Sequence, residues 1–518
     1  MSKALENQAQ FMGHPKGLYV LFLTEMWERF SYYGMRGLLS LYMATELVGD
    51  HRGAGLGWTD AEALKLYGWY TMLVYVMSIP GGLIADKLIG QKKSVLIGAI
   101  ILVAGHGVLA IEALWAFYTG LILVILGVGM LKPNISTMVG GLYGKNDIRR
   151  DKGFSIFYIG INLGSLLATT IVGLVVAKWG WHSGFGLAGI GMLLGLIVYI
   201  YGQKYLVHVG NKTTDTEKKD QVTFSQIFSD LLNTPSALIL VLVLIALSIY
   251  FGGFVLTGVD HWAYAALFTF ISMVIGMLII IYRSLRSQIE KDRFLVVLLS
   301  FFLVIVFWGA FEQAGGLMNL YAEDKTNRML FGWQVPTIWF QSLNAGFIIL
   351  FAVLVANYWA NRKLKNKEAS SLFKMATGTI IMGLGFVFMV FAVRDFQANG
   401  SSAMYWLVLA YFFHTIGELC SSPVSLSFVT KLAPVRYASL MMGLYFASTG
   451  LGNKVAGLLG ENASEFGEYT IFAGITIFTV MFGIGVIALL KPLKRLTHGA
   501  EENEGMDDND EAEGFELA

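Results

Sequence analysis

Charge is scarce in this chain of 518 residues. Only 14% of them are Asp, Glu, Lys or Arg, whereas roughly 25% is usual in soluble proteins. Hydrophobic residues make up 55%, and the mean hydropathy is +0.61. This composition excludes an ordinary soluble globular enzyme. At roughly 20 apolar residues per crossing, the chain has room for about a dozen membrane spans and little else.

Cysteine is almost absent as well. The one cysteine, Cys420, cannot form an intramolecular disulfide, and there is neither a CxxC motif nor a Cys/His cluster that could hold zinc. The formal net charge is only +1, so no general attraction to nucleic acid is expected. No Ser/His/Asp set, HExxH motif or nucleotide-binding loop stands at credible spacing. We therefore expect no enzyme activity, no metal and no cofactor.

Long apolar runs dominate what is present. Because lipid cannot satisfy free backbone polar groups, runs of this length predict helices, and the alternation typical of a membrane barrel is missing. The runs fall into six, two and six, which predicts an all-α membrane protein with fourteen spans. They lie at 17–47, 64–86, 94–115, 117–140, 153–177, 183–203, 234–252, 260–282, 295–320, 335–359, 372–393, 403–429, 437–460 and 468–490.

This order predicts two six-helix bundles with a helix pair inserted between them. We name residues 17–203 the N-terminal bundle and residues 295–490 the C-terminal bundle. The polar stretches between them read as cytoplasmic linkers, and the acidic C-terminus reads as a disordered tail. The remaining predicted segments are an N-terminal stretch (1–16), a first linker (204–233), the inserted pair (234–282, joined by a short turn at 252–260), a second linker (283–294) and the tail (491–518).

The distribution of Lys and Arg predicts the orientation. With the N-terminus inside, the inner loops and termini carry 27 of these residues and the outer loops only six. The positive-inside rule then places both termini in the cytoplasm of a multi-pass protein of the cytoplasmic membrane. The N-terminus is polar and no small-residue cleavage site follows the first run, so we expect that run to be retained.

Eight charged residues lie inside the predicted spans and away from their ends, four of each sign. Each costs on the order of 3 kcal/mol or more at the centre of an isolated inserted helix, so they should face one another or water. In the first span the polar residues form one stripe of roughly 100 degrees at mid-depth. The eight are Glu25, Glu28, Arg29, Arg36, Lys132, Glu312, Glu418 and Lys454, and no role for Lys454 follows from the sequence.

Two interpretations of these charges remain open at this point. They could be permanent ion pairs that hold a helical bundle, although apolar packing would serve as well. Alternatively, the pairs break: protonation of a buried carboxylate frees its basic partner for an anion or loosens a helix contact. A small zwitterion suits the second interpretation, because its amine can replace a base and its carboxylate can replace an acid.

Several motifs resemble known transporter signatures. The loop GGLIADK (81–87) followed by GQKK (90–93) resembles the cytoplasmic loop of the major facilitator superfamily. The first span, EMWERFSYYG (25–34), resembles the ExxERFxYYG motif of proton-coupled oligopeptide transporters, the POT or PTR family. FYIGINLGS (157–165), FWGAFEQ (307–313) and GELCSSP (417–423) also match this family, and the six, two, six plan is similar to its bacterial branch.

The resemblance implies a function and a set of site residues. It implies a symporter that imports di- and tripeptides with protons by alternating access, needing no cofactor and no obligate protein partner. It assigns proton coupling to Glu25, Glu28, Arg29 and Glu312, and outer gate pairs to Arg36 with Glu312 and to Lys132 with Glu418. The residues it implies for substrate are Arg29, Tyr32, Tyr33, Tyr75, Lys132, Asn162, Trp308, Asn344, Glu418 and Tyr445.

Two alternatives to peptide import stay open from the sequence. Branches of this family differ in cargo, so one alternative is a transporter of another small anion such as nitrate; an acid placed for an amine, Glu418, argues against it. The other is a peptide sensor that binds without translocating. Two positions depart from some relatives, since Phe311 replaces an acid and Tyr445 replaces a tryptophan.

Overall fold

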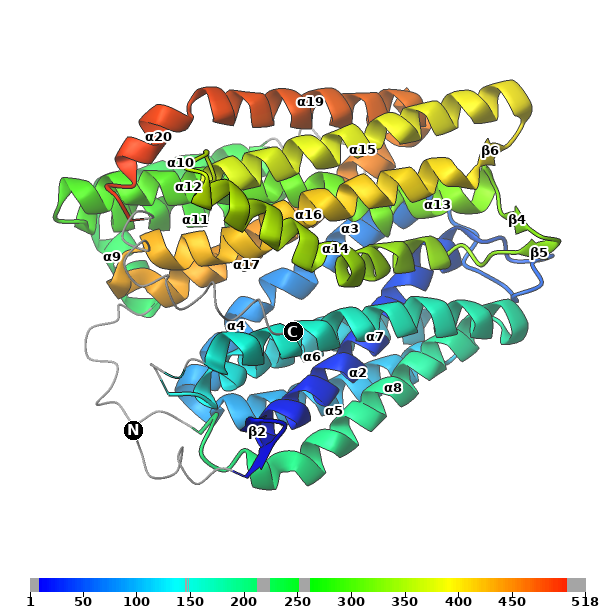
Figure 1. Cartoon of the computed structure of the whole chain (residues 1–518), viewed down its shortest axis with the longest axis horizontal. Coiled ribbons are helices and arrows are strands. Elements are labelled where there is room, and N and C mark those ends of the chain that lie inside the picture. The colour runs from blue at the N-terminus through cyan, green and yellow to red at the C-terminus, as the bar shows by residue number, and fades with distance from the viewer. Residues whose placement is uncertain (1–8, 145–146, 148, 212–223, 251–260, 501–518) are drawn as a thin grey trace. The chain divides into compact units, whose positions relative to one another are not determined.

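The structure is a computed structural model that describes residues 9–144, 147, 149–211, 224–250 and 261–500. Described residues are mostly helical, and the strands are two-residue pairs (Figure 1). The predicted turn at 252–260 lies outside the described residues. So do residues 1–8 of the N-terminal segment, 212–223 of the first linker and 501–518 of the tail.

Each predicted span of the N-terminal bundle coincides with helix. The second span is divided between two α-helices and a π-helical turn, which is followed by Gly90 with a φ of +82°. The elements are α2 (Lys16–Ala44), α3 (Asp60–Val76), α4 (Ser78–Ile84), η1 (Ala85–Ile89), α5 (Gln91–Leu109), α6 (Leu114–Gly141), α7 (Arg149–Trp179), α8 (Trp181–Gly202) and η2 (Gln203–Tyr205).

The inserted pair and the C-terminal bundle are helical in the same way. Their elements are α9 (Phe224–Asn233), α10 (Pro235–Tyr250), α11 (His261–Ser284), α12 (Gln288–Phe311), η5 (Glu312–Ala314), α13 (Leu317–Asp324), α14 (Trp339–Leu364), α15 (Ser371–Asn399), α16 (Met404–Leu432), η6 (Val435–Tyr437), α17 (Ala438–Glu461), α18 (Ala463–Phe466), α19 (Glu468–Ala488) and α20 (Leu490–Leu496).

Three short strand pairs lie outside these helices. β1 (Gln10–Phe11) pairs antiparallel with β2 (His14–Pro15), and β3 (Thr326–Asn327) pairs parallel with β6 (Ser402–Ala403). β4 (Met329–Leu330) and β5 (Trp333–Gln334) form a hairpin. Its two central residues, Phe331 and Gly332, have φ of 50° and 81°, as a type I′ turn requires.

The chain divides into two compact units, and three of the boundaries between them lie inside α12, α16 and α17. Unit 1 comprises residues 1–214, 301–426 and 443–488; within it α2 packs against α7 and α8, α5 against α6 and α8, and α15 against α19. Unit 2 comprises the remaining residues, and within it α10 packs against α11 and α9. The predicted domain boundaries stay a prediction.

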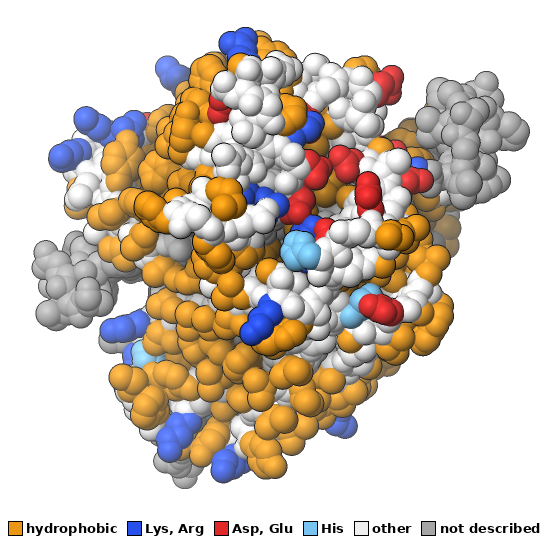
Figure 2. Space-filling model, turned by 90° about the vertical axis from the view of Figure 1, so that its right-hand side faces the viewer, with side chains coloured by type: hydrophobic (Ala, Val, Ile, Leu, Met, Phe, Trp, Pro, Cys, Tyr) orange, Lys and Arg blue, Asp and Glu red, His pale blue; other side chains and the backbone are white. Residues whose placement is uncertain are grey.

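Ten helices of the described chain are long and apolar enough to cross a membrane. The other four predicted spans coincide with α3 and α10, which have only 17 and 16 residues, and with α2 and α17, whose charged and polar residues lower their hydropathy. Large apolar side chains such as Ile122, Leu350 and Val353 are more than half exposed. Hydrophobic side chains cover much of the face in Figure 2. Such surfaces are expected against lipid.

The predicted span 295–320 is not one continuous helix. α12 ends at Phe311, a 3₁₀ turn carries Glu312, and α13 restarts at Leu317 after two glycines. A Cβ on Gly315 would collide with the hydroxyl of Tyr67, so glycine is needed for this close approach. The break therefore places Glu312 at a helix end, beside the N-terminal bundle.

Candidate functional site

The first charged cluster lies in the middle of α2. The Arg29 guanidinium contacts Oε1 of Glu25 at 2.7 Å and Oε2 of Glu28 at 3.1 Å. All three residues are at most 5% exposed. Within the described chain, Oε2 of Glu25 and both oxygens of Glu28 are buried and accept no hydrogen bond. Two carboxylates thus share one cation, and a proton on either would balance the cluster.

The second cluster joins the two bundles. The Arg36 guanidinium lies 2.7 Å from Oε1 of Glu312. The Tyr67 hydroxyl accepts a hydrogen bond from Nε of Arg36 at 2.8 Å and donates one to the same Glu312 oxygen at 2.7 Å. Arg36 is 8% exposed and Glu312 3%. Removing one partner of such a buried pair costs about 3–5 kcal/mol, so this contact holds the bundles together.

Neutral hydrogen bonds reinforce this contact one turn further along α2. Ser40 donates to the carbonyl of Gly315 at 2.9 Å, and the Asn319 amide donates to the carbonyl of Gly37 and to Ser40, both at 3.0 Å. Each of these side chains is buried. The start of α13 is therefore bound to α2 by polar contacts as well as by charge.

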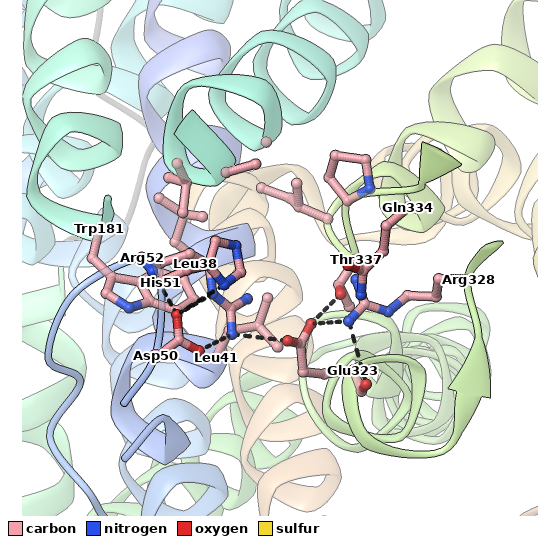
Figure 3. Close-up of a pocket in the computed structure, with 15 residues that line it drawn as sticks. Leu38, Leu41, Asp50, His51, Arg52, Trp181, Glu323, Arg328, Gln334 and Thr337 are labelled. Carbon is pink, nitrogen blue, oxygen red and sulfur yellow. Dashed lines mark hydrogen bonds and ion pairs between the residues drawn. The ribbon is translucent and has the colours of Figure 1, made fainter. Parts of the chain in front are cut away.

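A third cluster surrounds a cavity of about 300 Å³ beyond the end of α2 (Figure 3). Arg52 lies 2.7 Å from Oδ2 of Asp50 and 2.8 Å from Oε1 of Glu323, so it links the loop after α2 to the C-terminal bundle. Arg328 contacts the other oxygen of Glu323, Oε2, at 3.2 Å. Hydrogen bonds from Arg52 lower the pKa of Asp50, which keeps this carboxylate charged at neutral pH.

The predicted pair between Lys132 and Glu418 is not formed in this structure. The Lys132 ammonium lies 3.6 Å from the ring centroid of Tyr75, and no ion pair joins it to a carboxylate of the described chain. Glu418 accepts a hydrogen bond from the Asn344 amide at 2.8 Å, and the same amide donates to Thr415 at 3.1 Å. In this structure the polar partner of Glu418 is thus Asn344, whereas the predicted partner was Lys132.

The other predicted substrate residues are buried or half-buried in unit 1. Tyr33 lies under the Arg36 guanidinium, with 5.5 Å to the ring centroid, and packs edge-on against Tyr32. The Asn162 amide donates to a backbone carbonyl of its own helix, and Tyr445 hydrogen-bonds Ser425 at 3.0 Å. Trp308 packs against Phe307 and Phe311. Whether these residues meet one substrate stays a prediction.

The structure adds residues that the sequence did not single out. Tyr67, Ser40 and Asn319 join the bundles, but isolated polar residues in apolar helices gave no signal for this role. Arg52 and Arg328 belong to the six Lys and Arg residues of the predicted outer loops, and the sequence indicated no partner for either. The Asp50-x-Arg52 spacing was the one local sign of a pair.

Among the described residues, no group of three or more His, Cys, Asp or Glu side chains could hold a metal ion.

Lys454 contacts an aromatic ring of the other bundle. The side chain is fully buried, and its ammonium lies 4.5 Å from the ring centroid of Trp69. A cation on an indole face is a favourable contact in a dry site.

Comparison with known proteins points to one family. A family model described as the POT family matches residues 92–472. The chain is 36% identical to the peptide transporter YePEPT of Yersinia enterocolitica, over 95% of this chain and 97% of that one. It is 33% identical to a di-/tripeptide transporter of Lactococcus lactis subsp. cremoris, over 96% and 99% of the two chains.

Solved structures give the same result. A crystal structure of the peptide transporter POT with sulfate matches with a TM-score of 0.81 and 36% identity, over 94% of this chain and 97% of that chain. A POT family transporter in complex with 5-aminolevulinic acid matches with a TM-score of 0.79 and 30% identity, over 95% and 100%. The similarity therefore covers nearly the whole chain.

Proposed function

Because this chain belongs to the POT family, we propose that it imports di- and tripeptides together with protons across the cytoplasmic membrane. It is a multi-pass membrane transporter rather than an enzyme, and the predicted all-α major facilitator fold is confirmed. The proposal places both termini in the cytoplasm, so that the end of α2 and the cavity of Figure 3 lie on the outer side.

The observation that carries the proposal is the pair of buried clusters on α2. Arg29 is shared by two carboxylates seven residues before Arg36, which joins the C-terminal bundle through Glu312. A proton that neutralises Glu25 or Glu28 changes what Arg29 can bind, and one that neutralises Glu312 weakens the bond between the bundles. Protonation, cargo binding and opening are thereby linked, as alternating access requires.

In this proposal the closed side of the structure is the outer side. The Arg36–Glu312 pair, the hydrogen bonds of Ser40 and Asn319, and the Arg52–Glu323 pair all join the two bundles there. Lys132 and Glu418 would receive the peptide termini, with Asn344 holding Glu418 until an amine replaces its amide.

Uptake into proteoliposomes tests the function. With an inward proton gradient, a radiolabelled dipeptide should accumulate above its outside concentration, and dissipating the gradient with an ionophore should reduce this to equilibration. Binding without accumulation would identify a sensor instead. Accumulation of nitrate with no competition by dipeptides would identify the anion transporter.

The role proposed for Glu418 predicts a difference between peptides. Glu418→Gln removes the charge that pairs with a free amine, and a charge-assisted hydrogen bond contributes about 1.5–3 kcal/mol. We expect roughly 10-fold or greater weakening for dipeptides with a free amine, and a clearly smaller loss for N-acetylated ones. Competition against a radiolabelled dipeptide measures both. Equal losses for the two ligands would contradict the assignment.

A further inference from the structure

The two oxygens of the Glu323 carboxylate have different partners. Oε1 contacts Arg52 of the N-terminal bundle at 2.8 Å. Oε2 faces its own bundle: Arg328 lies 3.2 Å away, and the Thr337 hydroxyl donates a hydrogen bond to it. Arg328 is itself fixed, because it donates to the carbonyl of Val335 at 3.1 Å. Figure 3 shows Glu323 between the two arginines.

Arg52 is divided in the same way. Its Nε and one terminal nitrogen donate to the two oxygens of Asp50, at 2.9 and 2.7 Å, and its guanidinium lies 4.4 Å from the ring centroid of Trp181. Both of these partners belong to the N-terminal bundle. When the bundles separate, Arg52 keeps Asp50 and Glu323 keeps Arg328, so neither charge is left alone.

The Arg36–Glu312 pair lacks this arrangement. Arg36 keeps the Tyr67 hydroxyl of its own bundle, but among the described residues Arg36 is the one cation within ion-pair distance of Glu312. Separation would leave Glu312 as an uncompensated carboxylate at a buried position. The Arg36–Glu312 pair therefore opens at low cost only when a proton neutralises Glu312.

We propose that Asp50 and Arg328 are positioning residues that let the Arg52–Glu323 pair open without a proton. Arg328 does this by retaining Glu323, and Asp50 does it by retaining Arg52. Of these two ion pairs between the bundles, only Arg36–Glu312 then needs a proton in order to open. The inference deepens the proposed function, on which it rests for the identity of the outer side.

Labelling of an engineered cysteine reports opening without any substrate. In a Cys420→Ser background, Ile338→Cys introduces a thiol at a position that is 2% exposed, where Ile338 packs on Gly37 of α2. A membrane-impermeant maleimide should reach it only when the outer side opens. The test variants are Arg328→Gln and Asp50→Asn, which retains an oxygen for the backbone amide of Arg52.

Arg394→Gln is the matched control. Arg394 is an exposed arginine in the last two turns of α15 that donates to Tyr469, so its loss removes the same charge without touching Glu323. Arg328→Lys tests whether a cation alone suffices. The double variant Glu323→Gln, Arg328→Gln also removes the Glu323 carboxylate, which is the charge that Arg328 is proposed to retain.

We expect Arg328→Gln to slow labelling and to lower the maximal rate of dipeptide uptake by about two- to fivefold at neutral pH, with KM changed less than about twofold. The double variant should recover labelling, Arg328→Lys should recover most of it, and Arg394→Gln should match the parent. Asp50→Asn should slow labelling in the same direction.

Two results would overturn the proposal. One is labelling of Arg328→Gln that is equal to or faster than that of the parent, because Arg328 would then not ease opening. The other is a deficit that Glu323→Gln fails to relieve. Failure of the proposed function is distinct: the parent protein would then show no dipeptide uptake, while the labelling comparison would remain readable.

Discussion

Glu28→Gln is expected to abolish accumulation of dipeptide against its gradient while leaving exchange of peptide for peptide at a measurable rate. The same result is expected for Glu25→Gln. Both carboxylates contact Arg29 in a site that is at most 5% exposed. An amide cannot take up and release a proton, so the cluster would keep one charge state throughout the cycle.

The measurement compares two modes in the same proteoliposomes. Gradient-driven uptake should fall to the level seen with an ionophore, at least 10-fold below the parent for a group essential to proton transfer. Counterflow, with unlabelled peptide inside and no gradient, should persist. Glu112→Gln is the control, since the side chain of Glu112 is 78% exposed. Full accumulation in both Glu25→Gln and Glu28→Gln would refute the coupling role.

Arg36→Gln should produce the largest shift toward an open outer side. It removes the cation that holds Glu312 across the bundles at 2.7 Å. Loss of one partner of a buried pair costs about 3–5 kcal/mol, or more than a 100-fold change in an equilibrium constant. With the cysteine at position 338, labelling should therefore be at least about 10-fold faster than in the parent.

Tyr67→Phe should increase labelling in the same direction but by less. It keeps the ion pair and removes only the two hydrogen bonds of the hydroxyl, so a rise of a few fold is expected, in line with about 1 kcal/mol for one net hydrogen bond. Glu312→Gln with Arg36→Gln leaves no uncompensated charge and should still label fast. Unchanged labelling in Arg36→Gln would exclude the residue from the gate.

The sequence was informative wherever a residue type is costly in lipid. Apolar runs predicted the helices because backbone groups in a bilayer must bond internally, and all of the predicted spans coincide with helix at least in part. Charges in those runs predicted buried polar clusters because lipid tolerates them poorly. Seven of the eight are buried and Lys132 is half-buried.

The sequence predicted less well which of these charges pair with one another. The resemblance implied that Lys132 pairs with Glu418, yet Glu418 accepts a hydrogen bond from Asn344 and Lys132 lies on Tyr75. The position of a residue in its span gives its depth only, whereas a contact also depends on helix rotation and on the separation of the bundles. The role of Lys132 and Glu418 as an outer gate pair stays a prediction.

The sequence by itself determined the chemical inventory: a helical membrane protein, balanced charges within its spans, and the motifs that resemble peptide transporters. The tertiary structure alone decided that Arg52 and Arg328 share one carboxylate and that Tyr67 bridges Arg36 to Glu312. The cost of burying charge depends on local composition and can be read along the chain. The contacts between the bundles, Arg52 with Glu323 and Tyr67 with Glu312, join residues that are far apart in the sequence, and only packing brings them within 3 Å.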